Sequence, residues 1–129
     1  MLQLKPETPD LWDSILPEEL RKLPEELARV DILLQDERLM EPFLRRFNQT
    51  QGRPGVPIST YLRLMYLKFR YKLGYETLVE EVSDSIAWRR FCGIGYQQRV
   101  PDASTLIKLT HKFGDEMLAE INSLIIANL

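Results

Sequence analysis

The 129-residue chain carries 17 basic and 19 acidic side chains, and 44% of its residues are hydrophobic, which is ordinary for one globular domain. Its single cysteine, Cys92, excludes an internal disulfide framework and fits a reducing compartment. No apolar run approaches the roughly 20 residues that cross a bilayer, and residues 1–9 lack the pattern of a signal peptide. We therefore expect a cytoplasmic protein with no membrane partner.

Charge is unevenly distributed along the chain. Residues 1–51 hold 7 basic and 11 acidic side chains, residues 52–113 hold 10 and 5, and residues 114–129 hold 0 and 3. We read these segments as an acidic N-terminal helical region, a basic core and a C-terminal amphipathic helix, all within one folded unit. The basic core fits a segment that faces a polyanion, and chance clustering of solvated charge is the alternative.

Two proline–glutamate patterns mark helix starts in the acidic region. Residues 16–19 and residues 23–26 each read Leu-Pro-Glu-Glu, which places proline and two acids in a first helical turn, where both are favoured. Asp36 can cap a third helix whose apolar positions continue to Phe47. Residues 51–57, rich in glycine and proline, then interrupt the helical pattern.

The strongest helical pattern runs from Ile58 to Leu73 and is apolar on two sides, which predicts a central helix that ends at a left-handed Gly74. Its polar stripe includes Arg63 and Arg70, which either extend a basic surface or pair with Glu80 and Glu81. Further helices are expected at 75–83, 85–92 and 103–113 and at the C-terminal end, and we predict an all-α domain with a helix-turn-helix-like unit. Inward-facing positions of the two shorter helices are Leu78, Val79, Val82, Ile86, Trp88 and Phe91.

The helix expected over residues 103–113 offers the clearest binding surface. Five polar side chains fall on or beside one face, while Leu106, Leu109 and Phe113 fall on the other; the polar set is Ser104, Thr105, Lys108, His111 and Lys112. Cations and hydroxyls on a helix whose back is packed against a core suit the major groove of DNA. An ordinary solvated face is the alternative interpretation.

Other cations in the basic core are weaker candidates for DNA contacts. Arg53, in the extended Gly52-Arg53-Pro54 segment, could enter a minor groove or could belong to an ordinary linker. Arg89 and Arg90 could hold phosphates, or could cover apolar surface beside Trp88.

Catalytic and metal-binding chemistry finds little support in the sequence. His111 and Cys92 are the single histidine and cysteine, too few for a structural zinc site, and Cys92 fits a small core residue better than a nucleophile. Adjacent acidic pairs on a helix diverge and cannot converge on one ion. We expect no catalytic residue, no metal and no cofactor.

Several runs together resemble the N-terminal domain of bacterial insertion-sequence transposases of the InsH type. They are Gly52-Arg53-Pro54, residues 61–68, residues 74–78, residues 84–92 and residues 100–106. The block Trp88-Arg89-Arg90-Phe91 followed by Pro101-Asp102 and Ser104-Thr105-Leu106 is the specific part, and residues 1–17 are similar to one subgroup.

This resemblance implies a nucleoid-associated domain that binds double-stranded DNA at the terminal inverted repeats of a mobile element. In the family an RNase-H-like domain with metal-binding acids normally follows, and none of its catalytic carboxylates can be mapped onto this chain. The resemblance therefore favours DNA binding without catalysis. The alternative is a self-association or docking module that partners a full-length transposase, with the apolar C-terminal helix, ending in residues 125–129, as a possible homodimer contact.

Overall fold

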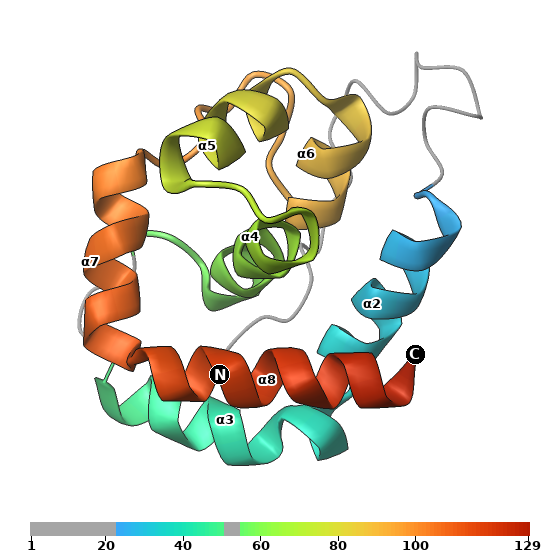
Figure 1. Ribbon diagram of the computed structural model, residues 1–129, viewed down its shortest axis with the longest axis vertical. Helices are drawn as coiled ribbons and strands as arrows, with labels where there is room; N and C mark the ends of the chain where they lie inside the picture. The colour runs from blue at the N-terminus through green and yellow to red at the C-terminus, as the bar shows by residue number, and fades with distance from the viewer. Residues whose placement is uncertain (1–22, 51–54) are drawn as a thin grey trace.

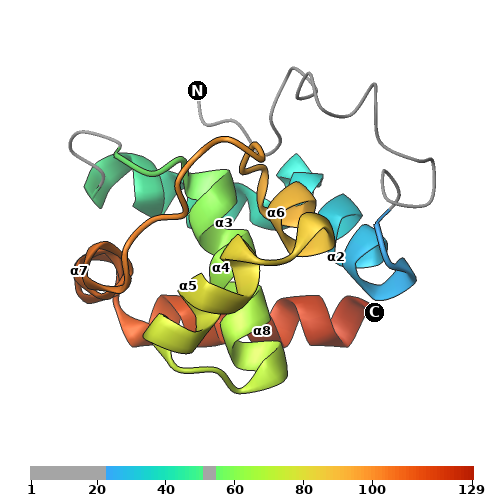
Figure 2. The ribbon, with the colours of Figure 1, turned by 90° about the horizontal axis from the view of Figure 1, so that it is seen from above.

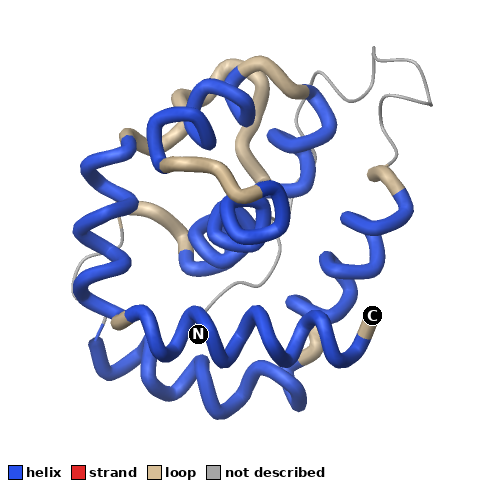
Figure 3. The backbone as a smooth tube through the Cα atoms, in the orientation of Figure 1, coloured by secondary structure: helices blue, strands red, loops and turns tan. Residues whose placement is uncertain are grey.

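The computed structural model describes residues 23–50 and 55–129, with side chains omitted for residues 46–50. Within these ranges only helices and loops are present, which confirms the all-α prediction (Figure 3). The helices are α2 (Glu25–Gln35), α3 (Glu37–Thr50), α4 (Ile58–Tyr71), α5 (Tyr75–Ser83), α6 (Ile86–Cys92), α7 (Ala103–Phe113) and α8 (Asp115–Asn128). The expected helix start at residues 16–19 lies outside the described residues.

Helix α4 is the centre of the domain, and the other helices are arranged around it (Figure 1). Every residue of α4 from Ile58 to Leu67 is buried, as expected for a helix that is apolar on two sides. Figure 2 separates α3 from α8, which overlap in Figure 1, and places α7 at one edge of the molecule in both views. The position of α7 leaves its outer side open to a partner.

Local chemistry explains three of the helix boundaries. The Asp36 carboxylate accepts the backbone N–H groups of Arg38 and Leu39, at 3.0 and 3.3 Å, at the start of α3. The Ser85 hydroxyl accepts the N–H of Trp88 at 3.1 Å at the start of α6. Gly93, with φ of 72°, then ends α6 in the left-handed conformation.

Two expectations about helix ends and burial are wrong. Helix α4 ends at Tyr71, and Lys72 rather than Gly74 takes the left-handed conformation, with φ of 56°. Gly74 has φ of −75° and precedes α5. Ile86, expected to face inward, is 37% exposed because it occupies the first position of α6 while Phe91 and Cys92 enter the core.

The predicted helix-turn-helix unit is not confirmed. Helices α6 and α7 both pack on α5, but the whole segment 93–102 separates them instead of a turn of about three or four residues. Helix α7 packs mainly against α5, α3 and α8, and α6 packs against α4, α5 and α2. Helix α7 is therefore held by α5, α3 and α8, and a short turn does not join it to α6.

Candidate nucleic-acid interface

Helix α7 has one buried side and one exposed side, and the exposed side is polar except for Ile107, which is 37% exposed. Leu106, Thr110 and Phe113 are buried. The outer surface, which we call the α7 face, carries exposed Ser104, Lys108, His111 and Lys112, with Thr105 half-buried at its edge. Among the candidate DNA contacts in the described residues, these five are the ones that share the outer side of α7.

A buried hydroxyl group ties α7 to the central helix. The Thr110 hydroxyl lies 2.9 Å from the Tyr61 hydroxyl and 3.1 Å from the Tyr75 hydroxyl, and it also bonds the Leu106 carbonyl at 2.9 Å. Burial raises the pKa of Tyr61, so its phenol stays protonated even in alkaline solution where an exposed tyrosine ionises. The Phe113 ring lies 5.4 Å from the Tyr61 ring, centroid to centroid. These contacts on α4 and α5 set the orientation of the α7 face.

Thr110 is a structural residue that the sequence pattern did not single out. The only sequence signal is its helical spacing from Leu106 and Phe113, which places its hydroxyl among apolar neighbours. A polar group in that position has to find partners when it is buried. Those partners come from α4 and α5, and their positions depend on the tertiary structure.

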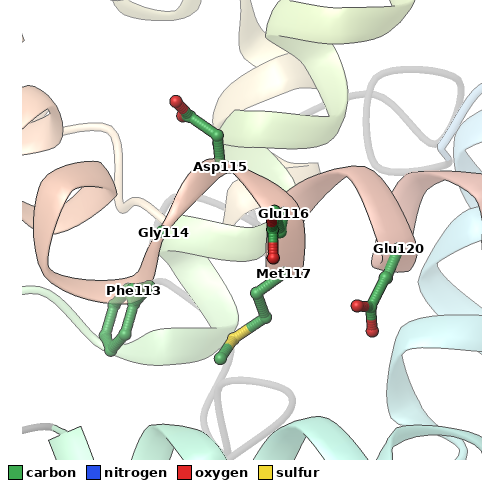
Figure 4. Close-up of a pocket in the computed structure, with 6 residues that line it drawn as sticks. All are labelled: Phe113, Gly114, Asp115, Glu116, Met117 and Glu120. Carbon is green, nitrogen blue, oxygen red and sulfur yellow. The ribbon is translucent and has the colours of Figure 1, made fainter.

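The two ends of α7 differ in chemistry. Asp102 stands at the N-cap position as expected, but its side chain makes no cap bond; instead its carboxylate accepts the Arg99 guanidinium at 3.2 Å. Gly114, with φ of 90° and ψ of 142°, joins α7 directly to α8. Just beyond it lies an open hollow lined by Phe113, Gly114, Asp115, Glu116, Met117 and Glu120 (Figure 4). Three carboxylates there repel phosphate, so the α7 face has an acidic boundary at this end.

Arg89 and Arg90, two DNA-contact candidates, brace the chain between α6 and α7. Arg89 donates from Nε to the Ser83 carbonyl at 3.0 Å and from Nη1 to the carbonyls of Gly95 and Gln98, both at 2.8 Å. Arg90 donates to the Tyr96 hydroxyl at 2.8 Å. Both side chains are half-buried in these contacts. Their observed contacts hold the connection that leads to α7.

Arg63, expected on a basic surface or paired with Glu80 or Glu81, lies in the core instead. Its side chain is 1% exposed, and Nη2 and Nε donate to the Asp31 carboxylate of α2 at 2.8 and 3.1 Å. Nη1 donates to the Ser59 carbonyl at 3.0 Å. Arg63 is therefore buried and paired with Asp31, and the expectation that it extends a basic surface is wrong.

Arg70 lies on the same side of α4 but nearer to solvent. Its Nε lies 3.1 Å from each carboxylate oxygen of Glu26 in α2, so its observed partner is again not Glu80 or Glu81. Tyr66 donates its hydroxyl to Glu26 at 3.3 Å, and burial, together with the Glu26 charge, raises the pKa of Tyr66 to about 12. The predicted polar stripe of α4 is therefore largely a seam between α2 and α4. Arg53, the remaining candidate, lies outside the described residues.

The described residues offer no group of three or more histidine, cysteine, aspartate or glutamate side chains placed to hold a metal ion. Cys92 is buried, as expected of a core residue, and burial raises the pKa of its thiol. A protonated, buried thiol is a poor nucleophile. None of the helices in residues 23–50 and 55–129 is long and apolar enough to cross a membrane.

The fold and the α7 face define a helical domain that presents one polar, cation-bearing helix from a packed core. Residues 16–112 match the family described as Transposase domain (DUF772). The match covers most of the chain, and the chain belongs to this transposase domain family. No curated protein and no solved structure matches the chain.

Proposed function

We propose that this chain is the DNA-binding domain of an insertion-sequence transposase and that it recognises the ends of the element. The observation that carries the proposal is the α7 face, where Lys108 and Lys112 stand beside hydroxyl and imidazole groups on a helix whose buried side is fixed. Lysines attract the phosphate backbone, and short polar groups can read base edges in the major groove. Membership of the transposase domain family supports this use of the surface.

The residues that we propose to contact DNA are those of the α7 face: Ser104, Thr105, Lys108, His111 and Lys112. Arg70, which lies on α4 and not on α7, is a secondary candidate. Arg70 is half exposed and already shared with Glu26, so a phosphate would have to compete for it. In a bacterial cell, a domain with this function would be associated with the nucleoid. We further propose that the chain binds DNA without cutting it, because the catalytic acids of such enzymes reside in a separate domain.

A binding titration tests the proposal. A fluorescein-labelled duplex carrying the inverted repeats that flank the coding sequence is titrated with the protein at several KCl concentrations, beside a scrambled duplex of the same composition. We expect tighter binding to the repeat, with an affinity that falls as salt rises, by about 0.9 in log–log slope for each phosphate contact. Absent or salt-independent binding would contradict the proposal.

Variants assign the binding to α7. Lys108→Ala with Lys112→Ala should weaken binding to both duplexes and make the salt slope shallower by about 0.9 per lysine. Arg38→Ala, which removes one exposed cation at the start of α3, is the control for each single lysine variant and should leave the slope unchanged. If the control weakens binding as much as the lysine variants, net charge and not the α7 face controls binding.

Self-association through α8 is a second candidate function, and one observation favours it. Ile126 is 69% exposed and Leu129 is 46% exposed, so the C-terminal turn of α8 leaves apolar side chains uncovered. If this turn pairs with a second copy, sedimentation velocity should show a concentration-dependent dimer that Ile126→Glu abolishes. A chain that stays monomeric at high concentration would exclude this function.

A further inference from the structure

The connection from α6 to α7 contains a tightly held turn. The backbone N–H of Gln98 donates to the Gly95 carbonyl at 3.0 Å, and the Gly95 N–H donates to the Gln98 side-chain oxygen at 2.7 Å. Arg89 bonds the carbonyls of both residues. Ile94 and Val100, on either side of the turn, are buried in the core. These bonds fix the backbone of the turn, and therefore the position from which the next side chain, that of Arg99, extends.

Arg99 follows this turn directly and, among the described residues, has the most exposed side chain of the arginines in the ion pairs. Its side chain is 87% exposed, and its single recorded partner among the described residues is Asp102, whose side chain is 58% exposed. Asp102 is the residue immediately before α7, two positions from Ser104. The Arg99 guanidinium therefore lies beside the first turn of the helix that carries the α7 face.

A phosphate can displace the Asp102 carboxylate from the Arg99 guanidinium. One N–H···O contact at 3.2 Å between two exposed side chains is weak in water. A phosphodiester can accept two guanidinium N–H groups at once, which is a stronger and better oriented arrangement. The buried Arg63–Asp31 pair has no such access to solvent.

We infer that Arg99 is a DNA-backbone ligand that extends the α7 face beyond the start of α7, and that Asp102 holds its guanidinium until a phosphate replaces the carboxylate. This inference rests on the proposed function of α7. Once displaced, the unpaired Asp102 carboxylate repels phosphates next to Ser104, so it opposes the contact that Arg99 makes. The ligand is the phosphodiester backbone of a duplex, so the contact is independent of base sequence.

Two substitutions of opposite expected sign test the inference in the salt titration of the repeat duplex. Arg99→Ala removes one phosphate contact, so we expect weaker binding and a slope shallower by about 0.9. Asp102→Asn removes the competing carboxylate and keeps a residue that is favourable at an N-cap, so we expect tighter binding. Arg38→Ala and Glu37→Gln, both at exposed positions at the start of α3, make the same charge changes away from α7.

The outcomes separate this inference from the proposed function. If Arg99→Ala and Asp102→Asn match their α3 controls while the Lys108 and Lys112 variants weaken binding, Arg99 is no DNA ligand and the proposed function stands. If the unmodified protein shows no salt-dependent binding, the proposed function itself fails. Each variant must also keep the circular dichroism spectrum and the unfolding midpoint of the unmodified protein. A lowered midpoint for Arg99→Ala would show that Arg99 stabilises the fold, and would contradict its role as a DNA ligand.

Discussion

The seam between α2 and α4 and the α7 face both carry cations at helical spacing, yet the fold uses them in opposite ways. Arg63 and Arg70 lie along α4 and meet Asp31 and Glu26 of α2. Lys108 and Lys112 lie along α7 and are exposed at the edge of the molecule. The comparison shows that cations along one helix become structural when acidic side chains of another helix reach them.

Breaking the seam should have the largest effect on stability. Asp31→Ala leaves the Arg63 guanidinium buried without its carboxylate, which we expect to lower the free energy of unfolding by about 3–5 kcal/mol. Urea unfolding followed by circular dichroism measures the loss. Arg29→Ala, which removes an exposed arginine that pairs with Glu25 on α2, is the control and should cost under about 1 kcal/mol. Equal losses of unfolding free energy for the two variants would show that the buried Arg63–Asp31 pair stabilises the fold no more than an exposed pair does.

The attachment of α7 to the core should give the next largest effect. Thr110→Val keeps the shape of the side chain but removes the hydroxyl shared by Tyr61 and Tyr75, so we expect a loss of about 1–3 kcal/mol. Thr77→Val, at an exposed position of α5, makes the same chemical change and should be nearly neutral. A Thr110→Val protein as stable as the Thr77→Val protein would argue against the hydroxyl network.

The junction between α7 and α8 should be sensitive to backbone conformation. Gly114→Ala places a Cβ at φ of 90°, and since no atom beyond the adjacent residues lies within 4 Å of that Cβ, the cost is conformational rather than steric. We expect a loss of about 1–3 kcal/mol in thermal or urea unfolding. Gly74→Ala is the matched control, because its φ of −75° suits alanine and its Cβ also meets open space. A neutral Gly114→Ala would mean that the junction relaxes freely.

The α7 face should matter least to stability. Lys108→Ala and Lys112→Ala remove exposed cations and should change the free energy of unfolding by no more than about 0.5 kcal/mol each. Urea unfolding of the two variants is therefore expected to match the unmodified protein while DNA binding falls. A large loss of stability would place these lysines in the same structural role as Arg63.

Sequence patterns predicted the helices well because helical period and caps are local. The bounds of α7, the burial of α4 on two sides and the cap at Asp36 all follow from residues close together in the chain. The burial of Arg63 could not be predicted from the sequence, because its partner Asp31 is distant in sequence and the exposure of Arg63 depends on where α2 packs. Likewise, the bracing contacts of Arg89 depend on the path of the chain after α6, which periodicity does not describe.

Mapping the bound surface by NMR tests the central claim most directly. In ¹⁵N–¹H spectra recorded while the repeat duplex is added, we expect the largest shift changes at residues 99–112 of the α7 region, with little change in α2. The scrambled duplex should perturb the same amides more weakly. Changes centred on α2 or on the C-terminal turn of α8, with α7 unaffected, would contradict the assignment of the α7 face as the DNA-binding surface.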